Sequence, residues 1–219
     1  LGLLAVGAFF MQSLKPVSRM LIMPEIRFGS EPALVPAPAA LSSPLLRTEL
    51  AEVNALQAKR TPQINERIAL WQNTPVQRWN DIARGLVTRN NIGPTRASRI
   101  YALLSVAQYD AMQTIAHHRE FFGPVRPDGV FDYPSSHAAI AAASAIVLSD
   151  LFPSEAASLI QQAREHQELM LYAGVNVRSD LVAGETIGRL VAQQVNEYAH
   201  RDRSDDRFSG VLPIGEGIW

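Results

Sequence analysis

Apolar residues recur at steps of three and four along most of the chain after residue 45, the spacing of one helix face. The first such segment has Leu46, Leu50, Val53 and Leu56 at these steps. The longest, Thr95–His118, has its apolar side at Ile100, Leu103, Leu104, Ala107, Ala111 and Ile115. Alternating, strand-like patterns are nearly absent, so the pattern predicts an all-α fold.

Prolines, glycines and capping residues divide the rest of this region into further helices. The expected helices are Ile64–Trp71, Pro75–Arg89, Ser135–Leu151, Ser154 to about Tyr172, and Asp180 to about His200. Ser154 is expected to cap the helix that it begins. The small residues of SSHAAIAAASAIVLSDL indicate close contact with another helix on at least one face. We therefore expect an antiparallel helical bundle without internal repeats.

The first segment, Leu1–Leu14, is apolar and carries no charge. As a helix it would be ~21 Å long, shorter than the ~30 Å hydrocarbon core of a bilayer. Three interpretations stay open: a truncated membrane anchor, the back end of an uncleaved signal sequence, or a buried N-terminal helix of the fold. We favour the anchor, because Lys15 and Arg19 follow at once and suit a headgroup boundary.

Residues 15–45 contain six prolines and cannot form a regular helix. An extended linker or a docked arm is expected there, and the apolar residues Leu34, Val35 and Leu41 favour the docked arm over a disordered tether. The predicted organisation is an apolar membrane-anchor candidate at 1–14, a proline-rich arm at 15–45 and a helical domain at 46–219.

Composition and charge exclude several classes of protein. The net charge is -1 and no basic stripe is present, so nucleic acid is not an expected partner. The chain has no cysteine, which excludes disulfides, thiolate catalysis and cysteine zinc sites. Its 219 residues, 47% of them hydrophobic, suit one compact domain with attachments.

Three segments carry groups that suit an oxyanion. Arg119 and Arg126 flank an apolar turn, and the guanidinium fork matches oxyanion geometry. Ser135 and Ser136 begin a helix, where unpaired N–H groups and hydroxyls can donate, and His137 beside them can exchange a proton. The third segment, LMLYAGVNVRSD, contains Asn176 and Asp180 after a turn at Gly174. Taken singly, each has an ordinary structural explanation as surface arginines, a helix cap or a helix–turn–helix junction.

Taken together, the three segments resemble the vanadium haloperoxidase and type 2 phosphatidic-acid phosphatase superfamily, in its bacterial branch. The family pattern is K-x6-R-P, then P-S-G-H, then S-R-x5-H-x3-D. Arg119 and Arg126-Pro127 match the first element, with Arg in place of Lys, and Pro134–His137 matches the second, with Ser136 in place of Gly. The resemblance covers roughly residues 70–219, from RIYALLSVAQYDAM to the closing LPIGEGIW. The loop DGVFDY before Pro134 is shorter than this family's enzymes usually have.

The third element is degenerate. Leu169 and Met170 stand at the Ser-Arg pair, Asn176 at the histidine and Asp180 at the aspartate. The resemblance implies that this histidine is the covalent phosphoryl acceptor or the axial ligand of vanadate. An amide has no such nitrogen lone pair, and methionine cannot neutralise an oxyanion. We therefore expect no catalytic residue.

What stays is a remnant site, called the candidate site below, with residues Arg119, Arg126, Ser135, Ser136, His137, Asn176 and Asp180. Its candidate oxyanion-binding residues are Arg119, Arg126, Ser136 and His137. No metal and no cofactor are expected, and vanadate or phosphate is implied only if the chain is an enzyme. The nearby His117, His118 and His166 are not expected to replace the missing imidazole.

The expected function is that of a non-catalytic, membrane-associated structural or interaction subunit of a larger assembly. Protein partners would meet the N-terminal segment and the arm, membrane lipid would meet the anchor, and the helical domain would lie on the periplasmic or extracytoplasmic side of a bacterial membrane. Two alternatives stay open: a phosphatase or haloperoxidase-like enzyme with an altered active site, and an oxyanion or lipid-headgroup binder without turnover.

Overall fold

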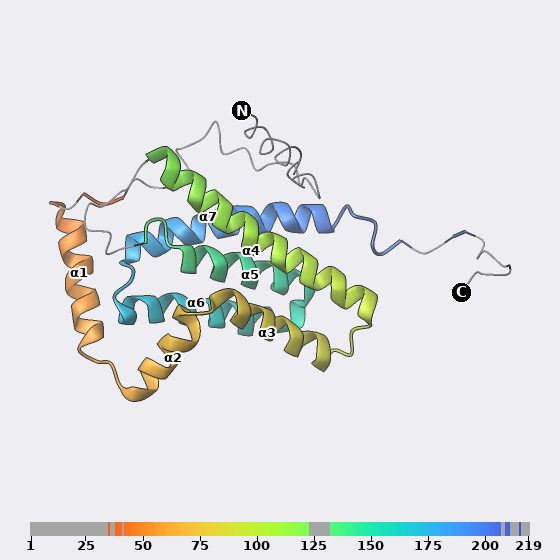
Figure 1. Cartoon of the computed structure of the whole chain (residues 1–219), viewed down its shortest axis with the longest axis horizontal. Coiled ribbons are helices and arrows are strands. Elements are labelled where there is room, and N and C mark those ends of the chain that lie inside the picture. Colours follow the sequence, from red (N-terminus) through yellow and green to blue (C-terminus); the bar gives the residue numbers. More distant parts are fainter. Residues whose placement is uncertain are drawn as a thin grey trace, which may run out of the picture.

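The computed structural model describes residues 35, 38–40, 42–122, 132–206, 209–210 and 215. Over these residues the fold is all-α, as predicted, and has no strand (Figure 1). The helices are α1 (Pro44–Gln57), α2 (Pro62–Gln72), α3 (Pro75–Arg89), α4 (Pro94–Phe122), α5 (Ser136–Leu151), α6 (Ala156–Ala173) and α7 (Arg178–Ala199), with a short 3₁₀ helix η2 (Pro153–Glu155) before α6.

The predictions for the N-terminal segment fall largely outside the described residues. Leu1–Leu14 and most of the proline-rich arm belong to this part. Val35 and Ala39, two described residues of the arm, pack against the helical core of the same chain. Within the described residues no helix is both long and apolar enough to cross a membrane.

Local sequence explains where most helices begin and end. Ser43 and Thr61 accept hydrogen bonds from the backbone N–H groups of Leu46 (3.1 Å) and Ile64 (3.3 Å), and a proline follows each cap. Gly174 ends α6 in the left-handed conformation, with φ 76°, which costs glycine little.

The predicted cap at Ser154 is wrong. The N–H of Glu155 donates to the carbonyl of Phe152 at 2.9 Å, which closes η2 around Ser154. Glu155 therefore precedes α6, and no side chain caps this helix.

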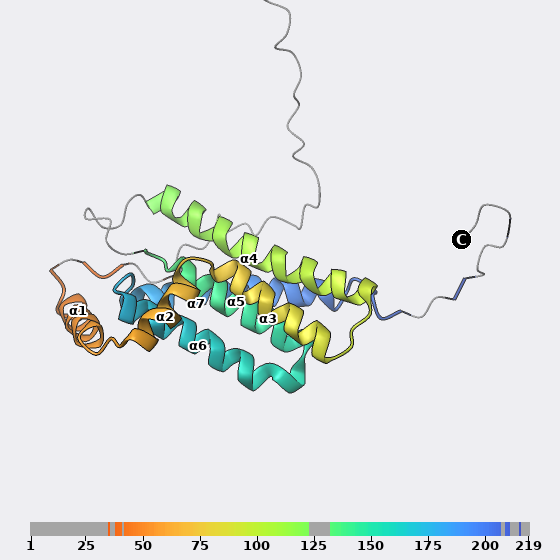
Figure 2. The same ribbon diagram turned by 60° about the horizontal axis from the view of Figure 1, so that its bottom comes forward.

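Helix α5 lies at the centre of the fold and contacts α4, α6 and α7 (Figures 1 and 2). It is buried on nearly every side, as is typical of a helix that is apolar all round. Its buried residues are Ala138, Ala139, Ile140, Ala141, Ala142, Ala143, Ser144, Ala145, Val147 and Leu148.

The helices from α4 to α7 alternate in direction along the chain. Helices that follow each other from α4 to α7 run antiparallel, as expected. In contrast, α5 and α7 run parallel: Ser135 N–H donates to the carbonyl of Asp180 at their starts (3.0 Å), and His200 meets Asp150 near their ends (2.9 Å). The two reversals between α5 and α7 return the chain to its earlier direction, as they do for every second helix of an up-and-down bundle.

Two glycines let α7 approach α5 closely. A Cβ atom added at Gly184 would lie 2.1 Å from the carbonyl oxygen of Ser135, and one at Gly188 would lie 2.3 Å from that of Ala139. Both neighbours are backbone atoms that cannot rotate away. This confirms the close helix–helix contact expected from the small residues of α5.

Helices α1, α2 and α3 cover one side and one end of this core (Figure 2). Glu49 of α1 is buried and accepts hydrogen bonds from the N–H (2.9 Å) and hydroxyl (2.8 Å) of Ser179 in the first turn of α7. Glu52 pairs with Arg178 in the same turn (2.6 Å). Helix α1 is thereby held against the beginning of α7.

Gly188→Ala is expected to lower the free energy of unfolding by about 1–3 kcal/mol, because the added methyl overpacks the α5–α7 contact. Gly85→Ala in α3 is the matched control, since its Cβ would meet only the flexible end of Arg89 at 3.1 Å. The control should be neutral or gain up to about 1 kcal/mol from helix propensity. Urea unfolding followed by circular dichroism measures both; equal values for the two variants would refute the close contact.

Candidate functional site

Asn176 lies just before α7 and is completely buried. Its Oδ1 accepts a hydrogen bond from the hydroxyl of Ser135 at 2.9 Å. Its Nδ2 donates to the backbone carbonyl of Asp132 at 3.0 Å. The structure therefore brings Asn176 and Ser135 together, and the Asn176 amide is hydrogen-bonded at both its oxygen and its nitrogen.

Asp132 is the central residue of the site and was missed by sequence reasoning. Its carboxylate pairs with the guanidinium of Arg119, at the end of α4, and accepts hydrogen bonds from the N–H of Ser136 (2.8 Å) and from the Ser136 hydroxyl. Arg119 also donates to the carbonyl oxygens of Tyr133 (3.2 Å) and Pro134 (3.1 Å). An acidic residue four positions before a serine at a helix start is the one signal that could have identified it.

Asp180 and Ser135 act as helix caps. The Asp180 carboxylate accepts the N–H of Val177 at 2.9 Å and is completely buried. The Ser135 hydroxyl accepts the N–H of Ala138 at 3.2 Å, in the first turn of α5. Both residues therefore satisfy backbone donors that a helix N-terminus leaves unpaired.

His137 turns toward a second histidine, His166 of α6. The Nδ1 of His137 lies 3.0 Å from the Nε2 of His166. The indole N–H of Trp79 reaches the Nδ1 of His166 at 3.4 Å. Because an indole can only donate, His166 Nδ1 accepts, and in the neutral ring its Nε2 carries the proton and donates to His137. Two hydrogen bonds donated in the same direction thus connect Trp79 of α3, through His166 of α6, to His137 of α5.

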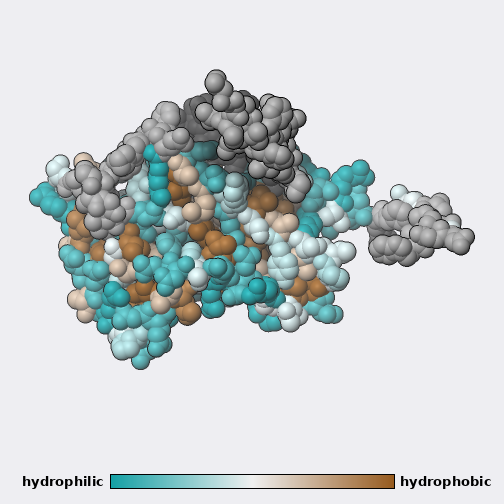
Figure 3. All heavy atoms as spheres, in the orientation of Figure 1, coloured by the Kyte–Doolittle hydropathy of each residue, from teal (hydrophilic) through white to brown (hydrophobic). Residues whose placement is uncertain are grey.

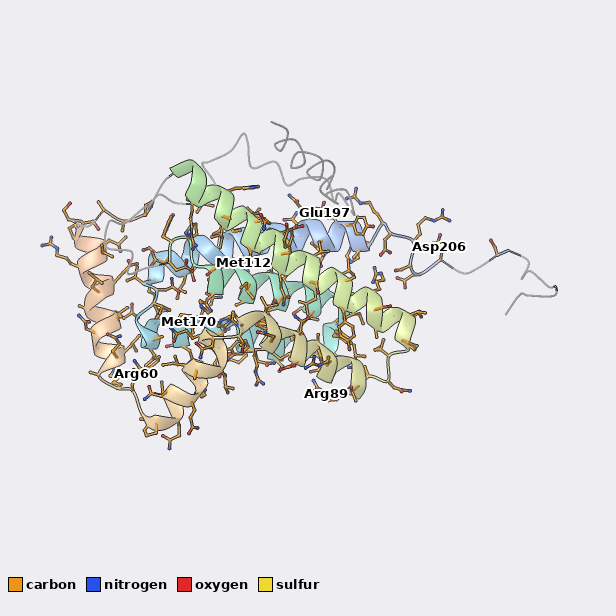
Figure 4. The ribbon with its side chains drawn as sticks, in the orientation of Figure 1. Arg60, Arg89, Met112, Met170, Glu197 and Asp206 are labelled. Atoms are coloured by element: carbon orange, nitrogen blue, oxygen red, sulfur yellow. The ribbon has the colours of Figure 1, made fainter. Side chains whose placement is uncertain are left out.

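The surroundings of this pair are apolar. His166 has no exposed surface and stacks on Trp71, with ring centroids 4.4 Å apart. Met170, one turn later on α6, is also fully buried, and it belongs to the same core as Trp71 and Trp79 (Figure 4). The position where the resemblance expects an oxyanion-binding arginine therefore faces the hydrophobic core.

Burial keeps both imidazoles uncharged. It lowers the pKa of His137 to about 4, and it lowers that of His166 well below the usual value, with the nearby His137 adding to the effect. Burial, and then the neighbouring charge of Arg119, also lowers the pKa of His118. Desolvation of the charged form is the common cause.

Two of the other histidines, His166 and His117, lie in different surroundings. Both nitrogens of His166 are engaged, and His117 is exposed. A surface hollow of about 460 Å³ lies between α2 and α6, beside Arg67, Arg164 and Tyr172, and its lining includes no residue of the candidate site. Within the described part of the chain, no group of three or more His, Cys, Asp or Glu could hold a metal ion.

The candidate site is therefore assembled in part. Five of its residues meet at the beginnings of α5 and α7: Arg119, Ser135, Ser136, Asn176 and Asp180. His137 belongs to the histidine pair, and Arg126 lies outside the described residues. No family model matches the chain, and no match to it is found among the curated proteins.

The histidine pair should make the stability depend on pH. In the unfolded chain these histidines take up protons below about pH 6.5, whereas the folded His137 stays neutral to about pH 4. The contribution of the neutral pair to the free energy of unfolding should therefore be complete above about pH 6.5. His137 alone should lower it by about 2–3 kcal/mol as the pH drops to 4, and His166 should add to this fall.

The variant His137→Gln combined with His166→Phe removes both imidazoles and keeps an aromatic ring against Trp71. Its unfolding free energy, measured in urea from pH 7 to pH 4, should depend less steeply on pH. His200→Gln is the control, because His200 is largely exposed beside Asp150. If the slope in the double variant equals that of the wild type, the pair is not the source of the pH dependence.

Proposed function

We propose that this chain is a non-catalytic domain of the vanadium haloperoxidase and type 2 phosphatidic-acid phosphatase type, which serves as a structural or interaction subunit of a membrane assembly. The observation that carries this proposal is the state of Asn176. It stands where the resemblance expects the reactive histidine, it is completely buried, and Ser135 and Asp132 engage its amide. An amide in this state neither attacks phosphorus nor binds vanadium.

The residues present do not fit vanadate. Its ligand would have to be an imidazole nitrogen, and Asn176 offers a carboxamide. Arg119 and Ser136, two of the expected oxyanion donors, are both engaged by the carboxylate of Asp132. A bound oxyanion would meet that negative charge at close range, which is unfavourable in a half-buried site.

The outward face of α4 supports a role in protein contacts. Its exposed residues from Ser98 to Ala116 are all uncharged: Ser98, Ala102, Ser105, Tyr109, Met112, Gln113 and Ala116. Tyr109 is 63% exposed and Met112 is 37% exposed. The exposed face of α3, in contrast, carries Arg78, Asp81 and Arg84.

An uncharged stripe with an aromatic residue and a methionine matches the composition of interface cores, from which charge is depleted. The face of the molecule in Figure 3 shows apolar patches among hydrophilic residues, and Met112 is labelled on α4 in Figure 4. We propose that this stripe receives an uncharged helix of a partner subunit. Val35 of the arm packs on the core cluster that includes Leu103 and Ala107, on the buried side of α4.

Membrane association is proposed to depend on Leu1–Leu14, which has no charged residue. The proline-rich arm would then connect this segment to the helical domain on the extracytoplasmic side.

The purified full chain is expected to hydrolyse p-nitrophenyl phosphate, and to oxidise bromide with vanadate and peroxide, only at background rates. His137→Ala should behave as the wild type does, because there is no reaction for His137 to assist. Asn176→His should also stay at background, since Asp132 still engages Arg119 and Ser136. Turnover by the wild type that His137→Ala abolishes would overturn the non-catalytic proposal.

The double variant Tyr109→Glu/Met112→Glu is expected to lose the partner that copurifies with the tagged wild type from its native membrane. Two carboxylates in an apolar contact would each lose hydration without a compensating partner. Val76→Glu is the matched control, because Val76 is an apolar residue of α3 with a similar exposure of 38%.

The comparison is made on variants whose circular dichroism matches that of the wild type, by quantifying the partner band in each eluate. A partner retained equally by both variants would exclude the α4 stripe as its binding surface. The absence of any stoichiometric partner of the wild type would contradict the subunit proposal itself.

A further inference from the structure

We infer that the Asp132 carboxylate is a built-in counterion, which takes the place of an external oxyanion at the beginning of α5 and closes this position to anions from solution. This inference rests on the proposed function and deepens it. It states that a side chain of the protein itself occupies the position where the resemblance expects the ligand of an active enzyme.

The donors that converge on Asp132 are those that an oxyanion would use. One carboxylate oxygen meets the Arg119 guanidinium, and the other accepts the N–H of Ser136 (2.8 Å) and the Ser136 hydroxyl. A permanent cation and the N–H groups of a helix start both favour an anion. The carboxylate supplies this negative charge from within the chain.

The loop that carries Asp132 is held by Asn176 and by the residue before it. The amide of Asn176 donates to the Asp132 carbonyl at 3.0 Å, and Asp132 N–H donates to the carbonyl of Val175 at 3.4 Å. Asn176 is itself fixed by the Ser135 hydroxyl at 2.9 Å. Asn176 is therefore a positioning residue: the amide that cannot act as a nucleophile helps to hold the carboxylate that fills the site.

Solvent reaches this position, so an external anion could enter if the carboxylate were removed. The side chain of Asp132 is 27% exposed and that of Arg119 is 40% exposed. Without Asp132, the Arg119 charge would lack its counterion and the Ser136 N–H would lack its acceptor. A small anion could then restore what the missing side chain supplied.

The experiment is anion rescue of Asp132→Ala in the full chain. The melting temperature is measured against increasing sodium formate or sodium phosphate, with chloride keeping the ionic strength constant. Asp132→Ala should melt about 5 °C below the wild type in chloride. Formate or phosphate should raise its melting temperature saturably, as expected for a ligand that binds only the folded state. The wild type should show no such increase.

Asp202→Ala is the matched control. Asp202 also pairs with an arginine, Arg99 at 2.7 Å, and accepts the N–H of Ser204 at 2.9 Å, but it does not lie at a helix start. It should be destabilised without specific rescue. Asp132→Asn, which keeps the shape of the side chain, serves if the alanine variant does not fold, and it should show the same anion response with a smaller amplitude.

An equal stabilisation of the wild type would show that the position is open and would overturn the inference. A response of Asp132→Ala no larger than that of Asp202→Ala would overturn it too. Either result, found together with background rates in the turnover assays, would leave the proposal of a non-catalytic domain intact. Turnover by the wild type would instead contradict that proposal, whatever the rescue shows.

Discussion

The backbone contact between α5 and α7 positions most of the other features of this protein. Gly184 and Gly188 let α7 approach the carbonyl oxygens of α5 where any side chain would collide. Because the two helices run parallel, their N-termini lie together, and the Ser135 N–H reaches the carbonyl of Asp180. Two positive helix ends and their unpaired N–H groups therefore share one region and must find acceptors there.

Carboxylates and hydroxyls of the chain itself supply these acceptors. Asp132 and Ser135 serve α5, whereas Asp180 and Glu49 serve α7. The same donors that could hold a ligand therefore stabilise the fold. Polar groups are paired within the protein on the apolar side of this region too. There, Trp79, His166 and His137 form a neutral hydrogen-bonded chain inside the core. Side chains of the kinds that often serve in catalysis are therefore hydrogen-bonded to other groups of the same protein.

Much of the helical framework follows from local sequence. Pro75–Arg89 was predicted with the bounds that the structure has, because a proline suits the first turn and the apolar period is regular. The expected apolar side of α4 is buried from Ile100 to Ile115. One local detail was wrong, because Ser154 lies in a 3₁₀ turn. The sequence pattern made no prediction that α5 and α7 pack directly on each other and run parallel. Periodicity reports which face is buried but not the direction of the neighbour that buries it.

By itself the sequence determined the all-α class, the helix start at Ser135 and the chemical limit of Asn176, because these depend on nearby residues or on a single side chain. Only the tertiary structure decided that Asp132 meets Arg119 and that His137 meets His166. These partners are separated by 13 and 29 residues, and their meeting depends on how three helices are directed and packed. The number of residues between two positions does not show whether their side chains meet until the packing of the helices is known.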